Sequence, residues 1–105
     1  GETVFPEELE VRFMKAAVRK AVSIKYVLFV PVEDSLWGQR LIALVRFSKG
    51  KLPPESLDFL DEIVKDWLPA ERPFAWYTCQ ALSPNSLGKW ERNKWIAWIK
   101  KASIG

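Results

Sequence analysis

The sequence has 105 residues, of which 49% are hydrophobic and 28% are charged, a composition that predicts one globular domain and excludes a disordered chain. Its 16 basic and 13 acidic side chains give a formal net charge of +3, an excess too small to indicate a nucleic-acid-binding protein on its own. With one cysteine, Cys79, and no histidine, the chain cannot form an internal disulfide, a cysteine–histidine zinc site or a cysteine–histidine catalytic pair.

The first residues indicate a segment of a longer polypeptide, because the chain begins at Gly1 and its only methionine, Met14, lies within a helical pattern. It has no charged-then-apolar leader and no apolar run of about 18 residues, so the sequence predicts neither a signal peptide nor a transmembrane helix. A lone cysteine suits a reducing compartment. We therefore expect a cytoplasmic protein.

The first half of the chain predicts one helix and two strands. Pro6 and the two acidic residues after it favour a helix start, and apolar residues at three- and four-residue steps extend this helix over residues 6–20. Residues 26–30 form a short, almost wholly apolar run, typical of a strand covered on both faces, and Pro31 is expected to end it. After a polar loop, a second apolar run predicts a strand over residues 40–47.

The second half predicts a helix, a strand and a last helix. Pro53 and Pro54 are expected to open a helix over residues 54–67, which carries one apolar stripe and ends before Pro69. Aromatic residues within 74–79 predict a third strand, and a basic amphipathic pattern predicts a helix over residues 92–102. This order predicts the α+β class, with a small three-stranded sheet packed by about three helices.

The loop before the last helix carries the residues best suited to chemistry. Gly88 permits backbone conformations that other residues disfavour and allows the close approach of a ligand. Lys89 follows it with a compact positive charge that can bind a phosphate group. From this loop alone, a solvated surface lysine is the favoured interpretation, because glycine–lysine pairs are common.

Four segments of the chain together resemble one known superfamily. Residues 84–92, P-N-S-L-G-K-W-E-R, are similar to the final core motif of the superfamily of acyl-CoA ligases, adenylation domains and luciferases, in which a Gly-Lys pair follows a proline and precedes an arginine. Three more segments resemble motifs of this superfamily in the same order: G-E-T-V-F-P-E-E-L-E at 1–10, W-G-Q-R at 37–40 and L-P-A-E-R-P at 68–73. The resemblance therefore spans nearly the whole chain.

The resemblance implies that residues 1–105 are the C-terminal lid domain of an ATP-dependent acid–CoA ligase. ATP, Mg²⁺ and the acyl substrate would be bound mainly by an N-terminal domain of the same polypeptide. In such ligases a carboxylate and ATP give an acyl-adenylate and pyrophosphate, the C-terminal domain rotates, and the thiol of CoA displaces AMP. The isolated chain is then expected to be inactive.

The same resemblance assigns roles to individual residues. Lys89 is the expected catalytic residue, because its charge would stabilise negative charge developing at the α-phosphate, and Gly88 would position it. After the rotation, CoA is expected to contact Gly1 and Glu2 near the hinge and to contact Trp37 and Arg72 through its nucleotide. Trp37 could stack on that nucleotide, and Arg72 could pair with its phosphates.

Some details of the motifs indicate a particular kind of ligase, and one segment departs from the pattern of the superfamily. The loop sequence and the tryptophan-rich end of the chain look most like the o-succinylbenzoate–CoA ligases of menaquinone and phylloquinone synthesis. Ala70 and Glu71 replace the aromatic residue and the lysine that are usual in the superfamily. This departure weakens the case that residues 68–73 hold the CoA nucleotide.

Several of these residues also have a purely structural interpretation. Trp37 could instead cover a sheet edge, Arg72 could be a solvated charge, and Cys79 is expected to be a small buried hydrophobe. The stripe of Trp95, Trp98 and Ile99 predicts core or interdomain packing.

The sequence also bears on non-enzymatic classes of function. Stacking on nucleic acid is disfavoured, because the aromatic residues have the spacing of a core. The last helix could lie on a membrane surface or bind another subunit, which would make the chain a non-enzymatic interaction module.

Overall fold

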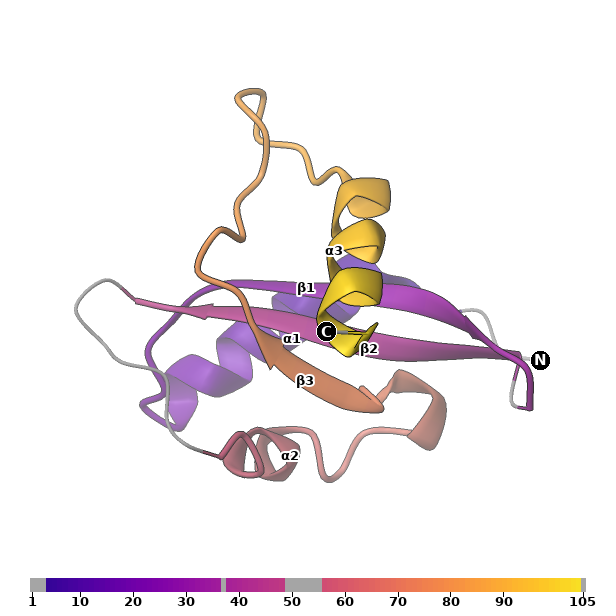
Figure 1. Cartoon of the computed structure of the whole chain (residues 1–105). Coiled ribbons are helices and arrows are strands. Elements are labelled where there is room, and N and C mark those ends of the chain that lie inside the picture. Colours follow the sequence, from indigo (N-terminus) through magenta and orange to yellow (C-terminus); the bar gives the residue numbers. More distant parts are fainter. Residues whose placement is uncertain (1–3, 37, 49–55, 105) are drawn as a thin grey trace.

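The computed structural model describes residues 4–36, 38–48 and 56–104. In these residues a three-stranded sheet in the order β1-β2-β3 is covered by helices on both faces (Figure 1). Strands β1 and β2 are antiparallel, whereas β2 and β3 are parallel. The predicted α+β class is therefore confirmed. In chain order the elements are α1 (Pro6–Arg19), β1 (Ile24–Asp34), β2 (Gly38–Phe47), α2 (Phe59–Ile63), the short 3-10 helix η1 (Pro69–Glu71), β3 (Ala75–Thr78) and α3 (Arg92–Ile104).

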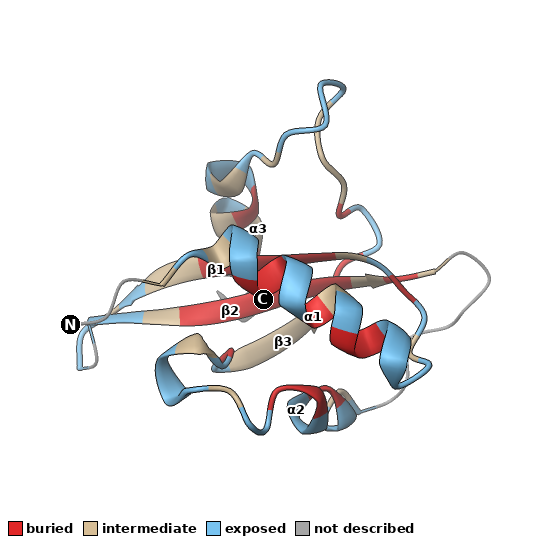
Figure 2. Cartoon of the chain, turned by 180° about the vertical axis from the view of Figure 1, so that it is seen from behind, coloured by how far each residue is buried: buried red, intermediate tan, exposed pale blue. Residues whose placement is uncertain are grey.

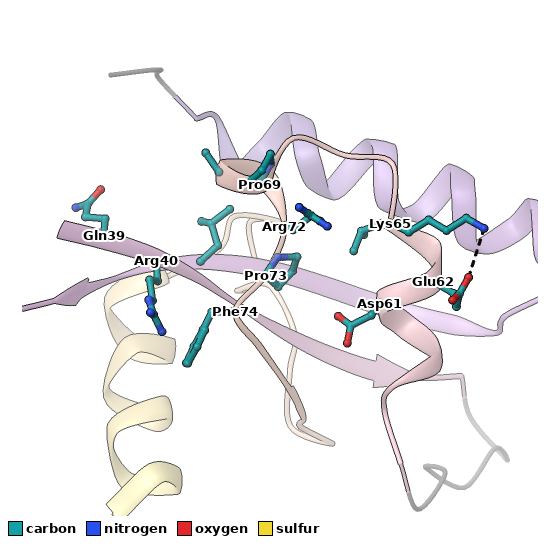
Figure 3. Close-up of a pocket in the computed structure, with 12 residues that line it drawn as sticks. Gln39, Arg40, Asp61, Glu62, Lys65, Pro69, Arg72, Pro73 and Phe74 are labelled. Atoms are coloured by element: carbon teal, nitrogen blue, oxygen red, sulfur yellow. Dashed lines mark ion pairs between the residues drawn. The ribbon is translucent and has the colours of Figure 1, made fainter. Parts of the chain in front are cut away.

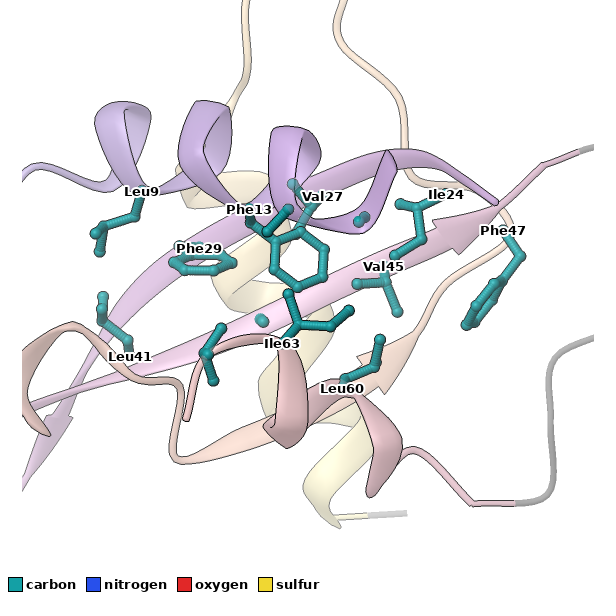
Figure 4. Packing of buried hydrophobic residues seen from close by; sticks show 14 residues of the cluster. Leu9, Phe13, Ile24, Val27, Phe29, Leu41, Val45, Phe47, Leu60 and Ile63 are labelled. Atoms are coloured by element: carbon teal, nitrogen blue, oxygen red, sulfur yellow. The ribbon is translucent and has the colours of Figure 1, made fainter. Parts of the chain in front are cut away.

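The apolar runs of β1 and β2 pack on both faces of the sheet. Val27 and Phe29 of β1 belong to the cluster under α1 and α2, whereas Leu28 and Val30 belong to the cluster under α3. Side chains of a strand alternate between faces, so a continuous apolar run is what a doubly covered strand requires. Figure 4 shows the first cluster, and Figure 2 shows its buried positions along one side of α1.

Helix α1 forms where it was predicted and buries one face. Pro6 occupies its first turn with Glu7 and Glu8, which suits the positive end of the helix. Phe13 is fully buried, and its ring centre lies 6.0 Å from that of Phe29. Full burial of one such side chain contributes roughly 1.5–3 kcal/mol to folding.

The expectation that Pro31 ends the first strand is wrong, because β1 continues to Asp34. β1 lies at the edge of the sheet and pairs only with β2. Phe29 directs its backbone N–H away from β2, toward a side chain of α1. Two residues further on, Pro31 presents its nitrogen to the same free edge, so its missing N–H removes no bond from the β1–β2 ladder.

The second predicted helix is shorter than residues 54–67. Helix α2 spans only Phe59–Ile63 and ends at Val64, whose ψ of 10° departs from helical geometry. The chain then turns, with the Trp67 N–H donating to the Val64 carbonyl at 3.0 Å. Leu60 and Val64 are nevertheless buried, so the apolar stripe was correctly predicted although the helix was not. Residues 53–55, where the start of this helix was predicted, lie outside the described residues.

Helix α3 packs its apolar face on the sheet. Trp95 and Ile99 are buried beside Leu28 and Leu44, as the core interpretation of their spacing predicted. This face is therefore covered by the protein's own strands and is not free to lie on a membrane. Among residues 4–36, 38–48 and 56–104, no helix has the length and apolar character needed to cross a bilayer.

Candidate functional site

The loop that carries Lys89 projects from the body of the protein. It connects β3 to α3 and extends away from the sheet on the side opposite α2 and η1 in both views (Figures 1 and 2). Lys89 is exposed, and within the described part of the chain its ammonium group has no ion pair or hydrogen bond. Leu87, two residues earlier, is 80% exposed. The loop thus presents an unpaired cation beside an exposed apolar side chain.

Hydrogen bonds close the tip of this loop into a compact turn. The Asn85 N–H donates to the Lys89 carbonyl at 2.8 Å, and the Gly88 N–H donates to the Asn85 carbonyl at 2.9 Å. The Asn85 Oδ1 accepts the N–H groups of Leu87 at 2.9 Å and of Lys89 at 3.0 Å. Gly88 has φ of +81°, a conformation that costs other residues roughly 1–2 kcal/mol.

The loop is also fixed where it leaves the sheet. The Cys79 N–H donates to the Val45 carbonyl at 2.9 Å, which continues the pairing of β3 with β2. Leu82 is fully buried, and its carbonyl accepts a hydrogen bond from Arg46 at 3.2 Å. Cys79 is buried as predicted, and this burial raises the pKa of its thiol.

An ion pair fixes the other end of the loop. Two guanidinium nitrogens of Arg92, the first residue of α3, lie 2.9 and 3.2 Å from the Glu10 carboxylate on α1. The Glu10 Oε2 also accepts the Phe29 N–H at 2.7 Å, and Arg92 donates to the Phe29 carbonyl at 2.8 Å. The pair thus satisfies both backbone groups that Phe29 exposes at the sheet edge. Glu10 and Arg92 belong to the first and last of the four segments recognised in the sequence.

A second candidate region is a hollow of about 750 Å³ near the end of the β1–β2 hairpin. Figure 3 shows Gln39 and Arg40 of β2 lining it together with Arg72 and Phe74. The structure therefore brings Gln39 and Arg40 of the W-G-Q-R segment together with Arg72 of the L-P-A-E-R-P segment. The hairpin turn before this hollow uses Gly38 at φ +84°.

The acidic residues of the hollow already have partners. Asp61 accepts a hydrogen bond from the Trp76 indole at 2.8 Å. The Glu62 carboxylate lies 3.5 Å from the Lys65 ammonium group. The carboxylates of Asp61 and Glu62 thus each have a partner at the rim of the hollow.

The two arginines of the hollow differ in their contacts. The Arg40 Nε lies 3.3 Å from Asp34, and its guanidinium carbon lies 3.9 Å from the centre of the Phe74 ring. Arg72 is exposed, and no ion pair or hydrogen bond of its side chain occurs within the described ranges. Arg72 is therefore the charge in this hollow that an anionic ligand could pair with most readily.

Glu71, the acidic substitution noted in the sequence, has a structural contact. Its carboxylate lies 3.1 Å from Arg12 of α1 and accepts the Leu68 N–H at 3.3 Å. The hydrogen bond from Arg12 lowers the pKa of the Glu71 carboxyl. Glu71 thus holds η1 against α1, and it contributes no positive charge to the hollow.

Metal binding has no evident site in the described ranges. No cluster of three or more Cys, Asp or Glu side chains suited to a metal ion occurs among them.

Structural comparison relates this fold to AMP-forming ligases. The chain superposes on an acyl-CoA synthetase from Brucella canis with a TM-score of 0.74 and 21% identity, covering 97% of this chain and 18% of that one. A double mutant of o-succinylbenzoate CoA synthetase from Bacillus subtilis, bound with its product analogue OSB-NCoA, gives a TM-score of 0.70 and 22% identity over 89% of this chain and 18% of that one. The amide bond synthetase McbA from Marinactinospora thermotolerans gives 0.71 and 20% over 90% of this chain and 18% of that one.

The fold is that of the C-terminal domain of adenylate-forming ligases. The chain spans about a fifth of the length of these solved structures. No protein-family model matches the sequence, and a comparison with curated proteins also finds no significant match.

The structure separates the predicted site residues into two regions of the ligase fold. Lys89 and Gly88 lie on the projecting loop, whereas Arg72 lines the hollow and Lys89 does not. Gly1, Glu2 and Trp37, the other predicted CoA contacts, lie outside the described residues.

Sequence reasoning missed the partners of these residues. The sequence motif contains Asn85 but does not assign it a role, although asparagine side chains commonly form hydrogen bonds with backbone groups two residues further on. Glu10 and Arg92 were noted as motif positions, but no local pattern indicated that they pair.

Proposed function

We propose that this chain is the C-terminal domain of an ATP-dependent acid–CoA ligase. The observation that carries the proposal is an exposed Lys89 that has no partner among the described residues and lies on a closed loop, within the fold of such a domain. In the first half-reaction a carboxylate oxygen attacks the α-phosphorus of ATP, and pyrophosphate leaves. In the second, the CoA sulfur attacks the acyl carbonyl carbon, the thiol proton is released and AMP leaves.

Lys89 acts in the first half-reaction through its charge. As carboxylate and phosphate oxygens crowd the pentavalent transition state, a nearby ammonium group offsets the negative charge, and no proton has to move. The projecting loop can carry this ammonium into a cleft of an N-terminal domain. That domain supplies most contacts to ATP, its Mg²⁺ and the acid.

The hollow at Arg72 serves the second half-reaction. Its exposed guanidinium suits the phosphates of the CoA nucleotide. Trp37 stays a predicted contact of that nucleotide, on the basis of the sequence alone. Because Lys89 does not line this hollow, the two half-reactions use different surfaces of the domain. A rotation between them would carry Lys89 away from the reacting atoms.

For the acid we propose o-succinylbenzoate, on the basis of the loop sequence and the tryptophan-rich last helix. Another acyl or aryl acid of the same superfamily is the alternative, because acid selection belongs to the N-terminal domain. We also place the protein in the cytoplasm, where ATP, CoA and a reduced Cys79 coexist.

The test of the function compares this chain with the full-length ligase that contains it. The full-length protein should release pyrophosphate only when both ATP and a carboxylic acid are present, and o-succinylbenzoate is the first acid to try. The chain alone should fold, as judged by a cooperative thermal transition, and should release none. Pyrophosphate release by the chain alone, or no release by the full-length ligase with any of a panel of acids, would contradict the proposal.

Replacing Arg72 with alanine tests the assignment of the hollow. In the full-length ligase this variant should raise the KM for CoA by about 10-fold or more, as expected when a charge-assisted contact worth about 1.5–3 kcal/mol is lost. Acyl-adenylate formation should stay nearly unchanged. Lys65→Ala, which removes a cation from the same hollow that already pairs with Glu62, is the matched control. Equal loss in both half-reactions would show that Arg72 does not serve CoA.

A further inference from the structure

The hydrogen bonds described above that close the Lys89 loop all involve one residue, Asn85, through its side chain or its backbone. Asn85 donates its N–H to the Lys89 carbonyl, accepts the Gly88 N–H at its own carbonyl, and accepts two further N–H groups at Oδ1. Lys89 is thus held at both its N–H and its C=O by the same residue. The side chain of Lys89 takes no part in these contacts and is left free.

The loop is anchored to the rest of the protein on both sides of residues 85–89. The fixed ends of the loop lie at Leu82, which is buried and bonded to Arg46, and at Arg92, which is paired with Glu10. Trp90 stacks edge-on against Tyr26, with ring centres 5.5 Å apart, which extends the fixed region almost to Lys89. Residues 85–89 project beyond these anchors, and among the described residues the hydrogen bonds of their backbone are the internal ones at Asn85.

We propose that Asn85 is the positioning residue for Lys89, an inference that rests on the proposed function of Lys89. Its Oδ1 accepts the N–H groups of Leu87 at 2.9 Å and of Lys89 at 3.0 Å. These bonds fix the direction in which the Lys89 side chain leaves the backbone. An electrostatic contact is effective only when it is preorganised, because reorganisation during the reaction costs free energy. Asn85 supplies that preorganisation without contacting the reacting atoms.

The kinetic test uses Asn85→Ala in the full-length ligase. Adenylation should slow by about 10- to 100-fold, since a displacement on the order of 1 Å at a catalytic group can cost about 100-fold. Thioester formation from preformed acyl-adenylate and CoA should be unaffected. In a Lys89→Ala background the same substitution should cause little further loss, because Asn85 acts through Lys89. Asn85→Asp keeps an acceptor oxygen at this place and should restore most of the rate.

A second measurement on the 105-residue chain is independent of activity. Amide hydrogen exchange at Leu87 and Lys89 should speed up in Asn85→Ala and stay protected in Asn85→Asp. Unchanged exchange in Asn85→Ala would overturn the inference, as would equal slowing of both half-reactions. If Lys89→Ala slows adenylation but Asn85→Ala does not, the inference fails while the proposed function stands. If Lys89→Ala has no effect, both fail.

Discussion

Replacing Lys89 with alanine in the full-length ligase should slow acyl-adenylate formation by about two to three orders of magnitude. This is the loss expected when one preorganised contact to a transition state is removed from a site that excludes water. Thioester formation from supplied acyl-adenylate and CoA should largely survive, because the rotated domain would carry Lys89 away. Two single-turnover assays on one variant separate these steps, one starting from ATP and acid and the other from acyl-adenylate.

The control for this variant is Lys101→Ala, which removes an exposed lysine from the last turn of α3. It changes the net charge equally but lies far along the helix from the loop, so adenylation should be unaffected. Lys89→Ala itself should alter the free energy of unfolding by no more than about 0.5 kcal/mol, because the side chain is exposed and leaves no cavity. If the Lys89→Ala variant forms the acyl-adenylate at the normal rate, Lys89 is only a solvated loop residue without a catalytic role.

The fold was largely predictable because its main signals are local. The run at 26–30 is almost wholly apolar, and a strand with both faces covered is the structure that such a run fits. Helix 54–67 was overestimated for the same reason, since a periodic stripe shows which side chains are buried but not whether the backbone stays helical. Pro31 was misjudged because a sequence does not reveal which strand lies at the edge of a sheet.

The candidate site was predictable only in part. Lys89 was identified because a motif marks it, and that motif says nothing about the acceptor that closes the loop. Glu10 and Arg92 are 82 positions apart, so their contact depends on the packing of α1 and α3 against β1. Arg72 was predicted from one segment, but its place beside Arg40 and Phe74 depends on the parallel pairing of β3 with β2.

Among the polar contacts of the described residues, we expect the Glu10–Arg92 pair to contribute most to the free energy of unfolding. Glu10 is 8% exposed, and its carboxylate binds both Arg92 and the Phe29 N–H. Removing one partner of such a pair leaves an uncompensated charge away from water. It also leaves the Phe29 carbonyl at the free edge of β1 without its donor.

Arg92→Met should therefore lower the free energy of unfolding by about 3 kcal/mol, the low end of the range for a buried pair, because the Arg92 side chain keeps 23% of its surface exposed. Urea denaturation of the chain measures this change. Lys65→Met removes a cation from an exposed pair with Glu62 and should cost no more than about 0.5 kcal/mol. Adding Glu10→Gln to Arg92→Met should recover part of the loss, since the amide oxygen can still accept the Phe29 N–H without a buried charge. Equal losses in the Arg92→Met and Lys65→Met variants would mean that the pair at the loop's end is only a surface contact.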